Sequence, residues 1–335
     1  MKFGPTSTSK ALGTVLAHSI GGLKKGSMLG VEQIAQLEAQ DIATVTVATL
    51  SDRDVGENEA AEQIAKAISG PDCLAYPSFT GRANVHAGKA GLVLVNEPML
   101  LKANSVHEAL TIACLKTHEL VSQGQMLTTV KIITFGVPRS AFRKVLNILS
   151  KGKLVTVAPL QPLSFGLVIT KTKSTKLSLI TKSEKAIAER LTRLGSVLGR
   201  VMICDHEKNS IAVVIKEIKA AGHAPILIFG ASAISDRADI VPSGLRKAGG
   251  RIVRLGMPVD PGNLLLLGEL AKTPVIGVPT CARSPKLNGF DWVLNRLCAG
   301  LTIKAQDLTT MAVGGLLTEI QSRPQPRESK KLGQG

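Results

Sequence analysis

The chain has 335 residues, of which 44% are hydrophobic, and a formal net charge of +16 at pH 7. This length is sufficient for two ordered domains. Aromatic residues make up only 3%, which implies aliphatic cores and disfavours nucleic-acid modules that stack bases on aromatic rings. No run approaches the ~20 apolar residues of a membrane span, and the first residues lack the apolar segment of a signal peptide. We therefore expect a cytoplasmic protein without membrane attachment.

The first part of the sequence, residues 1–137, predicts a mixed α+β domain. Its apolar spacing favours helices at 31–39, 58–68 and 107–121 and strands at 43–50, 91–95 and 126–133. The stretch 13–20 fits a strand or a short helix, and Asn58 is a candidate cap for the helix that it opens. Residues 138–165, which contain three prolines, are expected to form a linker.

The second part, residues 166–305, alternates apolar strands with helical segments. We expect strands at 166–170, 201–204, 226–229, 251–255 and 275–278, and helices at 182–198, 210–221, 240–248, 262–270 and 288–299. This alternation predicts an α/β fold, a three-layer α/β/α domain with a mostly parallel sheet. Residues 306–335 form a C-terminal extension, whose Pro/Gln/Ser/Lys-rich end from residue 323 is predicted to be disordered.

The five cysteines are dispersed and include no CxxC pair, which disfavours disulfides and structural zinc. Buried thiols are the favoured state. Cys281 follows a strand in a polar loop and is the one candidate for a reactive thiol, although no histidine lies near it in sequence.

Positive charge is concentrated between Arg139 and Arg200, where thirteen Lys or Arg residues stand against two acids. Such a block can be a solvated face, or it can guide an anionic ligand or an acidic protein partner. RNA binding is the weaker alternative, because no RNA-binding motif accompanies the charge.

The strand at 226–229 ends in a turn of small residues, Gly230, Ala231, Ser232 and Ala233. Small residues allow a ligand to approach the backbone, whose N–H groups can hold an anion. Asp236 and Asp239 follow, and acids beside an anion site indicate a metal ion or a proton-transfer step; a helix cap is the alternative for Asp239 or Asp205. Because ligands bind at the carboxyl ends of parallel strands, the turn and the loops 204–207, 256–263 and 279–291 are expected to meet there and to bind a phosphorylated ligand, with magnesium as a candidate metal.

At these residues the sequence resembles the molybdopterin-binding domain of molybdopterin adenylyltransferases and molybdotransferases. It is most similar to molybdopterin-binding proteins, some fused to a cytidylyltransferase domain, that carry FGASAI, GMPVDPGNL and CARSPKLNGFD. These strings stand here at 229–234, 256–264 and 281–291. The same proteins share TGRAN at 80–84 and TVKII at 129–133, so the resemblance extends to about residue 305.

The resemblance implies two sets of functional residues. Asp205 and Asp239 would be catalytic and would hold Mg²⁺. The molybdopterin site would contain Gly230, Ala231, Ser232, Ala233, Asp236, Asp260, Pro261, Gly262, Asn263, Arg283, Ser284, Lys286 and Asn288. Of these, Arg283, Ser284, Lys286 and Asn288 are expected to direct donors at the phosphate.

The sequence departs from the enzymes' pattern at Ala231, which replaces a glycine, and in the loop Pro279–Pro285, which replaces Pro-Gly-Asn-Pro. Binding of the cofactor or its nucleotide form tolerates such changes better than nucleotidyl transfer does. We therefore expect a molybdopterin-binding protein in molybdenum cofactor biosynthesis or delivery, with a nucleotide- and magnesium-dependent transferase as the alternative. A cytidylyltransferase or a molybdoenzyme apoprotein is the expected partner, and homo-oligomer formation stays open.

Overall fold

The computed structural model describes residues 1–317. The chain divides into two compact units, unit 1 from Met1 to Pro159 and unit 2 from Leu160 onward. No helix within the described residues is both long and apolar enough to cross a lipid bilayer.

Unit 1 begins with a small antiparallel sheet in the order β1-β3-β2. Strands β1 (Lys2–Ser7), β2 (Val15–Leu16) and β3 (Thr44–Thr49) pack with helix α1 (Val31–Glu38). The helix and the third strand confirm the predictions for 31–39 and 43–50. The turn helix η1 (Thr8–Lys10) follows β1.

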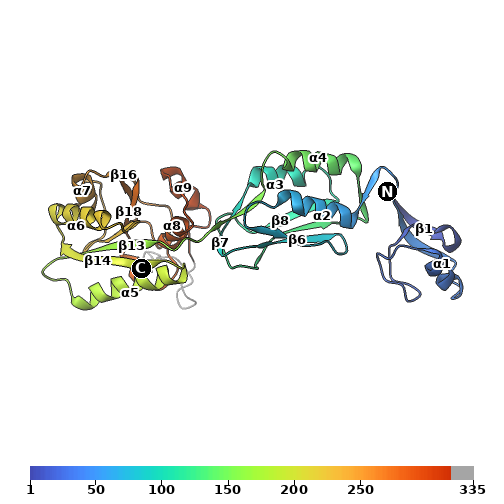
Figure 1. Cartoon of the computed structure of the whole chain (residues 1–335), viewed down its shortest axis with the longest axis horizontal. Coiled ribbons are helices and arrows are strands. Elements are labelled where there is room, and N and C mark those ends of the chain that lie inside the picture. The colour runs from blue at the N-terminus through green and yellow to red at the C-terminus, as the bar shows by residue number, and fades with distance from the viewer. Residues whose placement is uncertain (318–335) are drawn as a thin grey trace, which may run out of the picture. The chain divides into compact units, whose positions relative to one another are not determined.

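The rest of unit 1 is a four-stranded antiparallel sheet in the order β5-β6-β10-β8, with helices on one side (Figure 1). The strands are β5 (Cys73–Ala75), β6 (Arg82–Ala87), β8 (Leu110–Cys114) and β10 (Met126–Ile132). The helices are α2 (Glu57–Ile68), α3 (Glu97–Asn104) and α4 (Arg139–Leu149). Two small sheets complete the unit, β4 (Asp54–Gly56) with β11 (Gly136–Pro138), and β7 (Gly91–Val95) with β9 (Leu120–Val121) and β12 (Val155–Pro159).

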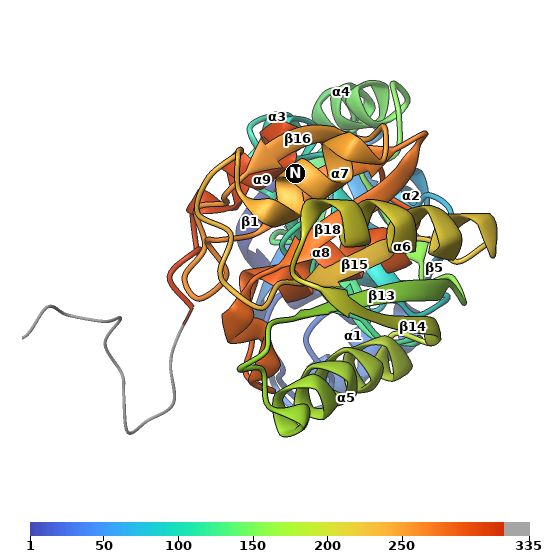
Figure 2. The ribbon, with the colours of Figure 1, turned by 90° about the vertical axis from the view of Figure 1, so that its left-hand side faces the viewer.

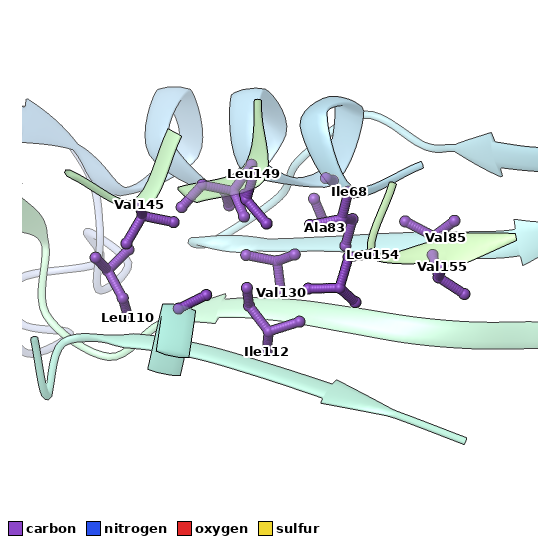
Figure 3. Close-up of a cluster of buried hydrophobic side chains, with 14 of the residues drawn as sticks. Ile68, Ala83, Val85, Leu110, Ile112, Val130, Val145, Leu149, Leu154 and Val155 are labelled. Carbon is purple, nitrogen blue, oxygen red and sulfur yellow. The ribbon is translucent and has the colours of Figure 1, made fainter. Parts of the chain in front are cut away.

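Aliphatic side chains fill the core of this part, as the low aromatic content requires. Figure 3 shows Ile68 of α2 and Leu149 of α4 packed above Val130 and Ile112 of the sheet. Ile68 and Val130 are completely buried. Each fully buried aliphatic side chain of this size contributes roughly 1.5–3 kcal/mol to folding.

Three predictions for unit 1 were wrong. Residues 107–121 form β8 and β9 instead of a helix, because Leu110 and Ile112 alternate with exposed residues at the period of a strand. The segment 138–165 contains α4 and β12, so it is not a linker; α4 buries one apolar face that includes Phe142 and Val145. Asn58 does not cap α2, which begins at Glu57 after Gly56.

Unit 2 has one six-stranded sheet in the order β14-β13-β15-β18-β17-β16. The strands are β13 (Ser164–Lys171), β14 (Val197–Asp205), β15 (Ile226–Phe229), β16 (Arg251–Leu255), β17 (Leu266–Leu270) and β18 (Thr273–Val278). The first four strands in this order pair in parallel, and only β17 runs antiparallel to its neighbours. All four residues of β15 are buried, as expected of a central parallel strand.

Helices cover both faces of this sheet, which confirms the predicted α/β/α class. Figure 2 shows α6 (Lys208–Ala220) and α7 (Ile240–Lys247) on one side of the strands and α5 (Leu177–Arg193) on the other. Helix α8 (Gly289–Cys298) packs into the same core as α5. Two separate hydrophobic clusters therefore lie on the two faces of the sheet.

The helix predicted at 262–270 is wrong, because residues 266–270 form strand β17. Leu266 and Leu267 are both buried, on opposite faces of the sheet. Gly268 lies where a Cβ would come within 2.3 Å of the Leu245 side chain, so α7 packs directly onto the strand. A run of leucines buried on both faces has no periodicity that separates strand from helix.

The extension after residue 305 packs onto unit 2. It forms α9 (Ala305–Thr309) and the turn helix η3 (Thr310–Ala312), and Leu308 and Met311 are buried in the core that contains α8. The tail predicted to be disordered from residue 323 lies outside the described residues.

Candidate functional site

The sheet topology of unit 2 brings five loops to one edge, which we call the rim. Strands β13, β14, β15 and β18 are parallel, and β16 has the same direction because two antiparallel pairings separate it from β18. The rim therefore consists of the loops that follow these five strands: 172–176, 206–207, 230–239, 256–265 and 279–288.

The Gly230 turn is held by polar side chains from the neighbouring strand and helix. The buried hydroxyl of Thr170, on β13, accepts a hydrogen bond from the Ala231 N–H at 2.8 Å. Arg283 donates to the Gly230 carbonyl at 3.1 Å and to Ser183 of α5 at 2.9 Å. Its guanidinium also lies over the Phe229 ring, 4.9 Å from the centroid. Arg283 therefore supports the turn, and burial lowers the pKa of its guanidinium.

His206 connects the turn to β13 and was not among the predicted site residues. Its Nδ1 lies 2.8 Å from the Thr170 hydroxyl, and its Nε2 lies 3.1 Å from the Ser232 hydroxyl. Thr170 donates to the Phe229 carbonyl at 3.4 Å and accepts from Ala231, which leaves it a second lone pair for a proton on Nδ1. We assign the proton to Nδ1 on this pattern, so that Nε2 accepts the proton of Ser232.

The environment of His206 favours the neutral form of its imidazole. Burial of the imidazole lowers its pKa below 6.5, and the nearby Asp239 carboxylate partly offsets that effect. A neutral histidine beside a hydroxyl can act as a proton acceptor.

Cavities lie on both sides of the turn. One, of about 470 Å³, is lined by Ala231, Lys182 and the loop 172–176. The other, of about 360 Å³, lies between residues 206–209 and the start of α7. Both volumes are in the range of small-molecule sites.

The loop 172–176 is the second feature that the sequence analysis missed. It contributes Thr172, Ser174, Thr175 and Lys176 to the larger cavity, and α5 begins directly after it without a side-chain cap. Free N–H groups at a helix start, hydroxyls and ammonium groups are all donors to an anion. In the sequence, Lys176 and Lys182 are distinguished only as members of the basic block between Arg139 and Arg200.

Three of the four predicted acids of the rim, Asp205, Asp236 and Asp239, lie in different settings. Both oxygens of Asp239 accept backbone hydrogen bonds, from Ile240 at 2.7 Å and from Ser235 at 3.1 Å, so Asp239 caps α7. Asp236 accepts from the Ala238 N–H at 2.6 Å. Asp205 ends β14 and is exposed. Within residues 1–317, no group of three or more His, Cys, Asp or Glu could hold a metal ion, so the magnesium assignment stays a prediction.

The loop containing Asp260, Pro261, Gly262 and Asn263 packs against the start of α8. The Gly289 N–H donates to the Pro261 carbonyl at 2.8 Å. A Cβ on Gly262 would lie 2.7 Å from the Gly289 nitrogen and 2.9 Å from the Asn288 side chain. The backbone of the 256–265 loop is thus placed directly beside the loop that follows β18.

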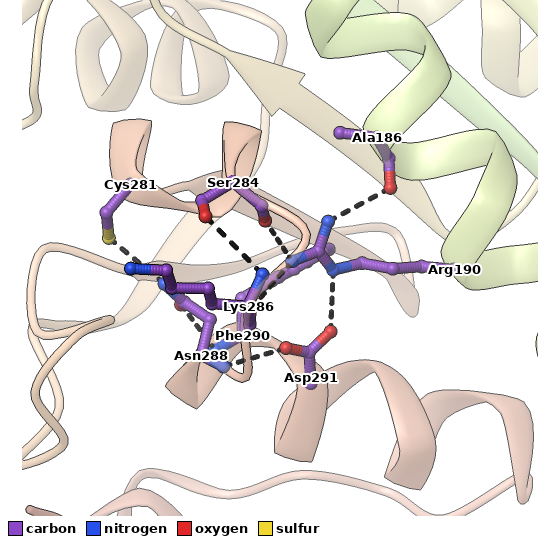
Figure 4. Close-up of polar contacts among 8 residues, drawn as sticks. All are labelled: Ala186, Arg190, Cys281, Ser284, Lys286, Asn288, Phe290 and Asp291. Carbon is purple, nitrogen blue, oxygen red and sulfur yellow. Dashed lines mark hydrogen bonds and ion pairs between the residues drawn. The ribbon is translucent and has the colours of Figure 1, made fainter. Parts of the chain in front are cut away.

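A buried arginine organises that second loop (Figure 4). Arg190 of α5, only 3% exposed, pairs with Asp291 at 2.6 Å. It also donates to the carbonyls of Ser284 at 2.8 Å and Lys286 at 3.3 Å, and to its own helix at Ala186. These contacts fix the course of the loop from the inside.

The predicted phosphate donors of this loop differ in their availability. Asn288 is buried, and its side chain accepts from Phe290 at 3.0 Å and donates to the Cys281 sulfur at 3.1 Å, so it caps α8. The Ser284 hydroxyl oxygen accepts a hydrogen bond from the Lys286 N–H at 3.4 Å. The Lys286 side chain is exposed. Of the predicted donors, Lys286 and Ser284 are therefore the ones open to a ligand.

The prediction that most of the thiols are buried holds for two of the five cysteines, Cys204 and Cys298, whereas the other three are only partly buried. Burial raises the pKa of Cys204 and Cys298 to about 11, so both are protonated at neutral pH. Cys281, the candidate reactive thiol, is half-buried and accepts the Asn288 hydrogen bond.

A larger cavity, of about 510 Å³, lies at the opposite end of the strands. Its lining is mainly apolar and includes Leu163, Pro225, Leu297 and Ile303. It contains none of the predicted site residues.

No protein-family model matches the sequence, and no curated protein matches it. Among solved structures, one similar chain is the molybdopterin biosynthesis MoeA protein from Pyrococcus horikosii, with 13% sequence identity and a TM-score of 0.33. The alignment covers 89% of this chain and 75% of that chain. This likeness is distant, and function is inferred below from the residues of this chain.

We expect Arg190→Ala to destabilise unit 2 by about 3–5 kcal/mol, because it leaves Asp291 and two carbonyls without their partner. The chain's single tryptophan, Trp292, lies in α8, so its fluorescence during urea unfolding reports on unit 2. Arg193→Ala, an exposed change on the same helix, is the control and should shift stability by less than about 0.5 kcal/mol. Equal stability of the two variants would contradict the role assigned to Arg190.

We expect His206 to titrate below pH 6.5, since burial lowers its pKa. The unfolded chain takes up this proton first, so the corresponding stability is lost as pH falls through 6.5. Asp239→Asn keeps a capping side chain but removes the charge that raises the pKa, and should lower it further. Proton NMR titration of the imidazole measures both values; a wild-type value above 6.5 would be inconsistent with a neutral His206.

Proposed function

We propose that unit 2 binds molybdopterin or its nucleotide form at the rim, with the phosphate beside the Gly230 turn, and that the protein acts in molybdenum cofactor biosynthesis or delivery. The observation that carries the proposal is the juxtaposition of the small-residue turn with the lysine- and hydroxyl-rich cavity at Ala231. The cofactor itself is proposed from the sequence strings at 229–234, 256–264 and 281–291.

The charge of the cavity supports an anionic ligand. Lys176 and Lys182 line it, and Lys173 lies in the same loop and is exposed. The first turn of α5 adds the partial positive charge of a helix N-terminus. No acidic residue lines this cavity, so the phosphate would meet donors and cations only.

The state of the acids favours binding over catalysis. Asp239, one of the two proposed Mg²⁺ ligands, already uses both oxygens to hold the start of α7. A carrier needs the cofactor to be held and released, whereas nucleotidyl transfer also needs a metal placed against the phosphates. In the carrier proposal a separate cytidylyltransferase or a molybdoenzyme apoprotein receives the cofactor.

We expect wild-type protein to bind molybdopterin with micromolar or tighter affinity that weakens as salt is added. Lys182→Ala removes a charged donor from the cavity and should weaken binding about tenfold to hundredfold. Lys216→Ala, on the exposed face of α6, is the matched control and should change affinity less than about twofold. Lys286→Ala, measured in the same titration, tests whether the 279–288 loop contributes to binding of the phosphate.

Isothermal titration calorimetry measures these affinities, and circular dichroism checks that each variant is folded. Absence of binding at low salt would refute the proposal. If Lys286→Ala but not Lys182→Ala weakened binding, the phosphate would lie at the 279–288 loop instead.

A molybdopterin nucleotidyl- or molybdotransferase is the second candidate, and the pair His206–Ser232 favours it. A neutral imidazole nitrogen 3.1 Å from a hydroxyl is the arrangement that a general base uses to take up a proton. Asp205, exposed at the end of β14, would be the metal ligand of such an enzyme.

For a transferase, we expect His206→Gln and Asp205→Asn each to lower turnover at least about 100-fold while pterin affinity changes less than about threefold. Product formation is assayed with ATP and with CTP. For a carrier, wild type shows no turnover with either nucleotide, and both variants still deliver the cofactor. Turnover that survives both substitutions would exclude these residues from catalysis.

A further inference from the structure

A second cavity with binding chemistry lies in unit 1, apart from the site proposed above. It has a volume of about 390 Å³ and is lined by residues from four segments: Lys25, Gly26, Glu57, Thr80, Lys131 and 133–135. Thr80 and Lys131 belong to the strings at 80–84 and 129–133, for which the proposed function of unit 2 gives no role. We propose that this cavity binds a small organic molecule through a phosphate or carboxylate group held between Lys25 and Lys131.

Two ammonium groups, those of Lys25 and Lys131, line the cavity. Lys131, on β10, donates to the carbonyl of Thr80. Lys25 lies 5.6 Å from the centroid of the Phe135 ring. Within the described residues, neither lysine has an ion pair within 4 Å, so their charge is balanced only at longer range by Glu57. An oxyanion between them would relieve their repulsion and accept charged hydrogen bonds.

Glu57 is the third polar group of the cavity. It is the first residue of α2, and its backbone N–H donates to the Phe135 carbonyl at 3.0 Å. Burial raises the pKa of its carboxyl despite the two lysines. In the part of the chain that the structure describes, no side-chain hydrogen bond or ion pair engages this carboxyl.

The 80–81 turn is tied to α2 by a side chain other than Glu57. The neighbouring Asn58 side chain already accepts the Gly81 N–H at 2.8 Å and so ties α2 to the 80–81 turn. That turn approaches Glu57 closely, since a Cβ on Gly81 would lie 2.4 Å from its Oε2. Thr80 itself has φ of 47°, a conformation that is costly for a β-branched residue. The turn is thus held in an unfavourable form directly at the cavity.

The size and lining of the cavity indicate a ligand larger than a bare ion. Its volume lies in the range of small-molecule sites, and Ile133 and Phe135 give it an apolar wall. An anionic head between the lysines and an organic part against this wall fit both features. Glu57 lies beside the head, where its ionised form opposes an anion and its protonated form can donate to one.

The test uses the full-length chain carrying Lys176→Ala and Lys182→Ala, which silences the phosphate site proposed in unit 2. Pyrophosphate and succinate are titrated by calorimetry as probes of the two ligand classes. We expect at least one of them to bind, Lys131→Met and Lys25→Met each to weaken that binding about tenfold or more, and Lys131→Arg to retain it because it keeps the charge. Lys24→Ala, an exposed neighbouring lysine, is the control.

Glu57→Gln is the diagnostic variant, since removing a negative charge beside an anion should tighten binding about twofold to fivefold. A purely structural glutamate would show no such gain. If pyrophosphate binds more tightly than succinate, the result supports a phosphorylated ligand. If succinate binds more tightly than pyrophosphate, it supports a carboxylate ligand. Binding of neither probe, or binding unaffected by the Lys131 and Glu57 changes, would overturn the proposal.

Discussion

One side of the rim of unit 2 depends on a single buried charge. Arg190 cannot remain inside the protein without partners, because an unpaired buried guanidinium costs several kcal/mol. Its partners are Asp291 and the carbonyls of Ser284 and Lys286, which lie about a hundred residues further along the chain. The requirement to satisfy this side chain therefore joins α5, the 279–288 loop and the first turn of α8. The same Asp291 accepts the Asn288 N–H, so the helix cap and the ion pair form together.

On the other side of the rim, the side chain of Thr170 likewise connects several segments. One hydroxyl on strand β13 contacts the end of β15, the Gly230 turn and His206. The Thr170 hydroxyl that supports the turn is thus buried and bonded to all three groups, whereas Lys176 and Lys182, which line the cavity beside the turn, are exposed. This division of a bonded inner layer from an open outer layer is what a preformed binding site needs.

The sequence was sufficient to predict the α/β/α class, because strands such as β13 and β15 are continuous apolar runs between helical segments. It also predicted the small-residue turn, which is a local feature. It failed at β17, where buried leucines fit a helix equally well, and at 107–121, where the alternation of buried and exposed residues in β8 extends over only five residues. The roles of Arg190 and His206 depend on partners 101 and 36 residues away. No local pattern encodes such pairs, and the capping roles of Asp239 and Asn288 could be separated from ligand binding only by their hydrogen bonds.

The contact between Gly262 and Gly289 has a consequence for how this chain can evolve. Each glycine lies where a side chain would collide with the other loop: at 262 with the backbone of Gly289, and at 289 with Val259, whose side chain would be 2.9 Å from the new Cβ. Neither Gly262 nor Gly289 can be replaced by a larger residue unless the facing loop moves away. Substitutions at these two positions must therefore be accompanied by changes in the facing loop. In a family of such proteins, the length and composition of the two loops would change together.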